Sequence, residues 1–136
     1  MIYLTRRERF SAAHRMFRPD WSDEINSKVF GKCSNPNWHG HNYILWVTIK
    51  GEISAETGFV MNMTLLKEII LRKVIDKLDH RNINTEVDFM KGKIATTENL
   101  AVSIWTELHP EIEKAGATLH CIKIEETENN TVEYYG

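Results

Sequence analysis

The pattern of apolar and polar residues predicts two strands in the first part of the chain. Apolar Ile2, Leu4 and Phe10 lie among polar residues, which is typical of a half-buried strand over residues 2–10. Residues 43–49 are aromatic and β-branched and are followed by Gly51, so they predict a second strand.

The connection between these strands is unusually long. It covers residues 11–42, whereas most connections in compact domains have about 4–6 residues. Residues 22–30 are expected to form a short helix that Gly31 ends, and the rest is expected to be irregular. A connection of this length is more often functional than idle, and most of the candidate chemistry lies in it or at its ends.

Apolar residues at helical spacing predict two longer helices. The first covers residues 64–78, and the second follows Thr96 and Thr97, either of which can cap it, and ends before Pro110. Apolar residues over 119–124 and 132–135 flank a polar turn and predict a terminal β-hairpin. We therefore expect one α+β domain over residues 1–136, with a four-stranded antiparallel sheet covered on one face by two helices.

Composition and charge exclude several classes of protein. The chain has 136 residues, 42% of them hydrophobic and 26% charged, and a formal net charge of -2, so no basic stripe for a nucleic acid or anionic lipid is expected. No apolar run is long enough for a membrane span, and the first residues lack the apolar region of a signal peptide. With two cysteines and no secretory signal, we expect a cytoplasmic protein with reduced thiols.

Three histidines are candidate metal ligands. His39 and His41 flank Gly40, and in an extended chain residues i and i+2 project to the same face. Gly40 adds no side-chain bulk, so the backbone can be approached closely there. If the two strands pair, His14 lies beside this pair, and three neutral imidazoles around Zn²⁺ leave a fourth position for water or substrate. Taken alone, His14 is more often an ordinary polar residue, and the His39–His41 pair is equally compatible with either interpretation.

A thiol and an acid–imidazole pair are further candidates. Cys33 lies in a turn-rich loop, where it could be a small buried residue, a zinc ligand or a base whose pKa a nearby imidazole lowers. Asp79 and His80 follow the first long helix, where they could supply that imidazole or form only a polar pair at the helix end. Cys121 is expected to be a packing residue in a strand.

Acidic residues close the third predicted strand. Such residues are usually solvated, but a carboxylate at Glu126 can accept two parallel N–H bonds from the amino and ring N–H edge of a pterin or a guanine. Thr96, Thr97 and Glu98, at the predicted start of a helix, could contact the same ring.

The chain resembles the 6-pyruvoyl-tetrahydropterin synthase family over nearly its whole length. The motifs that carry the resemblance stand in the family's order: Phe10-Ser11-Ala12-Ala13-His14, Phe30-Gly31-Lys32-Cys33, Asn35-Pro36-Asn37, His39-Gly40-His41-Asn42-Tyr43, Gly58-Phe59-Val60-Met61-Asn62, Leu78-Asp79-His80-Arg81-Asn82, Thr96-Thr97-Glu98-Asn99 and Glu126-Thr127 before Asn129-Asn130. The fold it implies is the tunnelling fold, in which three subunits join their sheets into a barrel and two trimers stack into a homohexamer.

The resemblance also implies a site and a reaction. It implies zinc held by His14, His39 and His41, and a catalytic triad of Cys33, Asp79 and His80 that is completed across a subunit boundary. It implies that Glu126 holds the pterin, helped by Thr96, Thr97 and Glu98. The implied reaction converts 7,8-dihydroneopterin triphosphate into 6-pyruvoyl-tetrahydropterin and triphosphate, and Arg15 and Lys32 are candidate triphosphate contacts.

Two alternatives stay open at this stage. The 6-carboxy-tetrahydropterin synthases of 7-deazaguanine (queuosine) synthesis use the same substrate and also release acetaldehyde, but typically have fewer residues between the cysteine and His-Gly-His than the five found here. A zinc- and pterin-binding protein without turnover would give Cys33 no chemical role. Trp38 and Glu125 depart from the residues typical of the family and could reshape the pocket.

Overall fold

The computed structural model describes all 136 residues, and its framework is one mixed sheet. The strand order is β3-β1-β2-β4-β5, and all neighbours are antiparallel except β3 and β1. The strands are β1 (Ile2–His14), β2 (His39–Gly51), β3 (Arg81–Asn82), β4 (Thr118–Thr127) and β5 (Asn130–Tyr134). The two long central strands, β1 and β2, are paired up to the residues His14 and His39, which lie opposite each other. All three candidate histidines therefore lie at this end of the strand pair.

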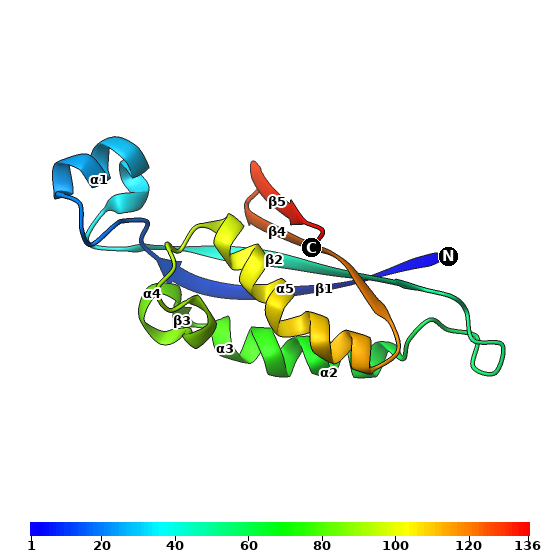
Figure 1. Cartoon of the computed structure of the whole chain (residues 1–136). Coiled ribbons are helices and arrows are strands. Elements are labelled where there is room, and N and C mark those ends of the chain that lie inside the picture. The colour runs from blue at the N-terminus through cyan, green and yellow to red at the C-terminus, as the bar shows by residue number, and fades with distance from the viewer.

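Helices α2 (Met63–Ile70), α3 (Asp76–Leu78) and α5 (Thr97–Lys114) lie along one face of this sheet, whereas α1 (Asp23–Phe30) stands apart at one end of the molecule (Figure 1). The long helix predicted over residues 64–78 is continuous but contains one π-helical turn between two α-helical parts. The other helical segments are a 3₁₀ turn (Gly31–Ser34), the π-turn (Leu71–Ile75), α4 (Ile83–Glu86) and a second 3₁₀ turn (Asp88–Met90). None of them combines the length and apolar character of a membrane span.

The core fills the space between the sheet and helices α2, α3 and α5. Alternate residues of β2 from Tyr43 to Ile49 are fully buried, and so are Leu66 on α2 and Ile104 on α5. The opposite face of β2 carries Trp46 and Thr48, which are only partly buried. The predicted arrangement of two long helices on one face of the sheet is confirmed.

Two features of the fold differ from the sequence-based expectation. The sheet has five strands rather than four, because β3 adds a parallel pair of residues to the edge of β1, and two residues are too few to show a periodic pattern. Helix α5 also continues through Pro110 instead of ending before it. The continuation keeps Leu108 and Ile112 buried on either side of an exposed proline, so packing outweighs the lost backbone hydrogen bond.

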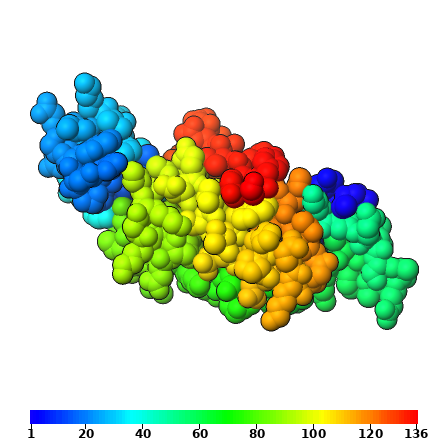
Figure 2. Space-filling model, viewed as in Figure 1, coloured from blue at the N-terminus to red at the C-terminus, as the bar shows by residue number.

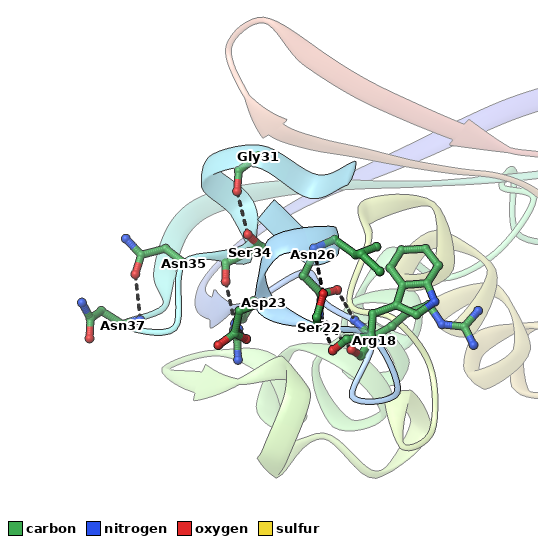
Figure 3. A network of polar contacts seen from close by, with 11 residues as sticks. Arg18, Ser22, Asp23, Asn26, Gly31, Ser34, Asn35 and Asn37 are labelled. Atoms are coloured by element: carbon green, nitrogen blue, oxygen red, sulfur yellow. Dashed lines mark hydrogen bonds and ion pairs between the residues drawn. The ribbon is translucent and has the colours of Figure 1, made fainter. Parts of the chain in front are cut away.

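Residues 15–38 form a lobe that projects beyond the helical layer at one end of the molecule (Figures 1 and 2). The short helix α1 expected here is present, and the side chain of Ser22 caps it by accepting the N–H of Ile25. Buried Asn26 accepts the Arg18 N–H and donates to the Arg18 and Trp21 carbonyls (Figure 3). The connection is therefore ordered by its own polar contacts, and it carries Cys33 at a defined place.

Candidate active site

The three candidate histidines converge at the end of the β1–β2 ladder. His14 pairs in register with His39, and His41 lies two residue pairs further along, opposite Ala12. Alternation along the strands puts all three side chains on the face that the helices cover. One ring nitrogen from each lies within 4.8 Å of those of the other two. The sequence-based expectation that paired strands bring His14 beside His39 and His41 is confirmed.

The surroundings of the imidazoles favour neutral rings with free nitrogen lone pairs. His14 is 1% exposed, and its Nδ1 lies 2.7 Å from the carbonyl oxygen of Ala95, which places the ring proton on Nδ1. Its Nε2 then points at Nε2 of His41, 3.1 Å away. Burial lowers the pKa of His14 and of His41, and both ring nitrogens of His39 are buried without a hydrogen-bond partner. The unpartnered nitrogens of His39, beside the facing Nε2 atoms of His14 and His41, fit a divalent cation as the missing partner.

Gly40 and Trp38 shape the backbone that delivers these rings. A Cβ atom on Gly40 would lie 3.1 Å from the Ala12 carbonyl oxygen, which confirms the expected close backbone approach. Trp38 adopts φ of 67°, a left-handed conformation that costs a bulky residue about 1 kcal/mol or more but costs glycine little. Its ring packs edge-on against Phe17, 6.5 Å between centroids. Trp38 is therefore tolerated at a turn where glycine would be unstrained.

A carboxylate adjoins the histidine cluster. Glu126 ends the inward-facing row of β4, and its Oε1 lies 3.8 Å from His41 Nε2. The hydroxyl of Thr97, in the first turn of α5, donates to Glu126 Oε2 and fixes the carboxylate. Both residues are largely shielded from solvent, with Thr97 only 7% exposed. The metal-type cluster and a carboxylate able to accept N–H groups thus share one site.

The other two residues predicted near this carboxylate have different surroundings. Thr96 caps α5, because its hydroxyl accepts the Asn99 N–H at 3.2 Å. Glu98 is exposed and makes no hydrogen bond or ion pair within the chain. The structure therefore brings Thr97, and neither Thr96 nor Glu98, into contact with Glu126.

Cys33 is held at the base of the lobe by contacts to the chain that follows β1. Its carbonyl oxygen accepts the Met16 N–H at 2.8 Å, and the Arg15 Nε–H donates to the Ser34 carbonyl oxygen at 2.7 Å. The guanidinium of Arg15 also lies 4.0 Å from the centroid of the Phe17 ring. Burial and the negative charge of Glu126 raise the pKa of the Cys33 thiol, so the single chain stabilises the thiol rather than the thiolate.

Asp79 and His80 lie at the outer edge of β1. Asp79 Oδ1 accepts the Ser11 N–H at 2.9 Å, and its Oδ2 lies 3.1 Å from His80 Nδ1. The His80 side chain is 83% exposed on a backbone with φ of 60°. No hydrogen bond links either residue to Cys33 within the chain. A cavity of about 520 Å³ borders His80 and His41.

Three contributors to the site were not predicted from the sequence. The Ala95 carbonyl that orients His14 and the Asn84 side chain that binds both backbone polar groups of Arg15 come from segments far away in the chain. Tyr43 is buried beside His41, with 5.5 Å between their ring centroids. Of the three, only Tyr43 could have been found from the sequence, because it stands two residues after His41 and therefore shares the same face of the strand.

Comparisons with known proteins identify the family of this chain. The family model described as 6-pyruvoyl tetrahydropterin synthase matches residues 3–136. A 6-pyruvoyl tetrahydrobiopterin synthase of Dictyostelium discoideum is 49% identical over 99% of this chain and 96% of its own, and the Homo sapiens protein of that name is 44% identical over 98% and 90%. The solved 6-pyruvoyl tetrahydropterin synthase of Caenorhabditis elegans superimposes with a TM-score of 0.92 at 37% identity, covering 99% of this chain and 95% of that one. The chain belongs to the 6-pyruvoyl tetrahydropterin synthase family.

Proposed function

We propose that this protein is a zinc-dependent 6-pyruvoyl-tetrahydropterin synthase that converts 7,8-dihydroneopterin triphosphate into 6-pyruvoyl-tetrahydropterin and triphosphate. The observation that carries the proposal is the adjacency of two binding groups: His41 Nε2 lies 3.1 Å from His14 Nε2 and 3.8 Å from Glu126 Oε1. A small molecule with a heterocycle at one end and hydroxyl groups at the other can therefore meet both. The relatives named above share this activity in their names.

His14, His39 and His41 are the proposed zinc ligands. Their convergent ring nitrogens, the unpartnered nitrogens of His39 and the Nδ1–carbonyl contact that orients His14 fit an ion with three protein ligands and an open position. Bound zinc would act as a Lewis acid toward the side-chain oxygens of the substrate.

Glu126 is the proposed anchor of the pterin ring. Its carboxylate can accept the ring N–H and the amino N–H in parallel. The hydrogen bond from the Thr97 hydroxyl fixes the orientation of this carboxylate. Thr96, which caps α5, and the exposed Glu98 are proposed to contact the pterin ring as well. Arg15 and Lys32 line one cavity of about 420 Å³, which supports their proposed contact with the triphosphate.

Cys33 is the proposed base that moves protons between the side chain and the ring of the substrate. A thiolate needs a nearby positive charge, and within one chain the strongest influences on this thiol are burial and Glu126, which oppose ionisation. We propose that Asp79 and His80 of a neighbouring subunit supply the imidazolium. The exposure of His80 supports that arrangement, because it leaves the imidazole free to meet a second chain. The assembly that we propose is the homohexamer that the family resemblance implies.

Product analysis tests the proposed function. Zinc-loaded protein is incubated with 7,8-dihydroneopterin triphosphate, and triphosphate and acetaldehyde are both quantified. Release of triphosphate without acetaldehyde supports the proposal. Release of both indicates a 6-carboxy-tetrahydropterin synthase, and release of neither indicates a binding protein. The Cys33→Ala protein, which keeps the three histidines, is expected to bind zinc and to lose turnover.

A further inference from the structure

Tyr43 is a buried polar residue that the proposed chemistry does not yet use. Its side chain is 1% exposed, yet its hydroxyl makes no hydrogen bond within the chain. The two nitrogens of His39, which share its face of the strand, are also buried without a partner. Buried polar groups are nearly always hydrogen-bonded, and an unpaired one at a site requires an explanation.

The position of Tyr43 shows what the hydroxyl faces. Its ring stacks on Phe10, with 4.8 Å between centroids and 10° between the planes, so packing holds the ring in one orientation. On its own strand it stands two residues from His41, with ring centroids 5.5 Å apart, and the ring of His14 is 6.2 Å away. Across the ladder Ile44 pairs with Glu125, so Tyr43 and Glu126 are the next neighbours and both face the helices.

The Tyr43 ring therefore adjoins both groups proposed to hold the ends of the substrate, with His41 beside it on its own strand and Glu126 across the ladder. Glu126 would take the amino and ring N–H edge of the pterin, and the histidine cluster would take the side-chain oxygens through its metal. Along the perimeter of the pterin from the ring N–H to the carbon that bears the side chain, the only polar atoms are two hydrogen-bond acceptors. They are the lactam oxygen and the ring nitrogen N5. Because the Tyr43 ring is packed beside His41 and His14, at the metal end, N5 is the nearer of the two.

We propose that the hydroxyl of Tyr43 donates a hydrogen bond to N5 of the bound pterin, the ring nitrogen next to the carbon that bears the side chain. This inference rests on the proposed function and adds to it a third contact, at the middle of the molecule. A donor held by stacking against Phe10 loses little conformational entropy on binding, so the contact fixes which face of the ring meets Cys33.

Binding measurements with two ligands test the inference independently of turnover. Neopterin and its 5-deaza analogue, in which C–H replaces N5, are titrated into wild-type and Tyr43→Phe protein by fluorescence. One neutral hydrogen bond corresponds to an affinity difference of about three- to tenfold. We expect Tyr43→Phe to weaken neopterin binding by that factor and to leave binding of the 5-deaza analogue unchanged. Tyr134→Phe, which alters another inward-facing tyrosine without a hydrogen bond, is the matched control and should bind both ligands like wild type.

Stability supplies a second readout, because removing a hydroxyl that has no partner in the chain should not lower the free energy of unfolding. A Tyr43→Phe protein that binds neopterin like wild type overturns the inference. So does one that loses affinity equally for both ligands, or one that is destabilised, since the hydroxyl would then bond another atom. A wild-type protein that binds no pterin overturns the proposed function as well.

Discussion

The Gly40→Ala substitution tests whether the spacing of two strands positions the histidines. The added Cβ would lie 3.1 Å from the Ala12 carbonyl oxygen and 3.6 Å from the Ala13 Cα atom. Both are backbone atoms, so the crowding is relieved only if β2 moves a few tenths of an ångström away from β1. Because His41 pairs with Ala12 and His39 pairs with His14, such a movement separates the imidazoles.

Two opposing contributions decide the change in the free energy of unfolding. Alanine in place of an unstrained glycine stabilises a protein by about 0.4–1 kcal/mol, because it restricts the unfolded chain. Overpacking a well-packed contact costs about 1–3 kcal/mol. We therefore expect the metal-free protein to lose roughly 1 kcal/mol. Zinc binding should respond more strongly, with an affinity about 10–100-fold lower, as is usual when the support of metal ligands is disturbed.

Chemical denaturation of the metal-free protein and a competitive zinc titration measure the two effects. Gly51→Ala is the matched control at the other end of β2, where the added Cβ meets a Val60 methyl group at 2.7 Å and so crowds a contact far from the histidines. It should leave the zinc affinity unchanged. A Gly40→Ala protein that is more stable than wild type and binds zinc equally well would refute the argument from strand spacing.

Three other substitutions give separate tests. Glu126→Gln keeps an acceptor for Thr97 but loses the charged pair of acceptors, so neopterin affinity measured by fluorescence should fall at least about tenfold, and an unchanged affinity would remove the proposed anchor. Pro110→Ala should raise the free energy of unfolding by about 2 kcal/mol, since proline costs about 3 kcal/mol inside a helix and restricts the unfolded chain by less; no gain in urea denaturation would contradict this. The Ser11 N–H, and then His80, hold the pKa of Asp79 below its usual range, so its stabilising effect is present above about pH 4 and is lost as the pH falls further. Acid denaturation of wild type should therefore be steeper in this range than that of Asp79→Asn, and equal slopes would contradict it.

Much of the fold was accessible from the sequence because its long elements bury one face each. The core residues of β2 and α5 follow periods of two and of about 3.6, and the structure places them as those periods predict. Short or interrupted elements were not accessible. β3 has only two residues, and α5 passes through Pro110 because tertiary packing outweighs a local preference.

The site, too, has features that could be predicted from the sequence and features that could not. The histidine convergence was accessible, because strand alternation and pairing in register bring His14 to His39. The contact of Thr97 rather than Thr96 with Glu126 was not, since one residue of helix phase decides which side chain turns inward and which caps. The Ala95 carbonyl that orients His14 was also inaccessible, because a backbone group carries no sequence signal.

The ligand set of the bound ion is the most direct test of the account. Cobalt(II) is titrated into the metal-free wild-type and Cys33→Ala proteins while the visible and near-ultraviolet absorption is recorded, and His41→Ala serves as the ligand-loss control. We expect wild type and Cys33→Ala to bind one ion per chain with superimposable spectra that lack a sulfur-to-metal charge-transfer band, and His41→Ala to bind far more weakly. A charge-transfer band that disappears in Cys33→Ala, or a His41→Ala protein that binds like wild type, would contradict the proposal that three imidazoles hold the ion and leave the thiol free for proton transfer.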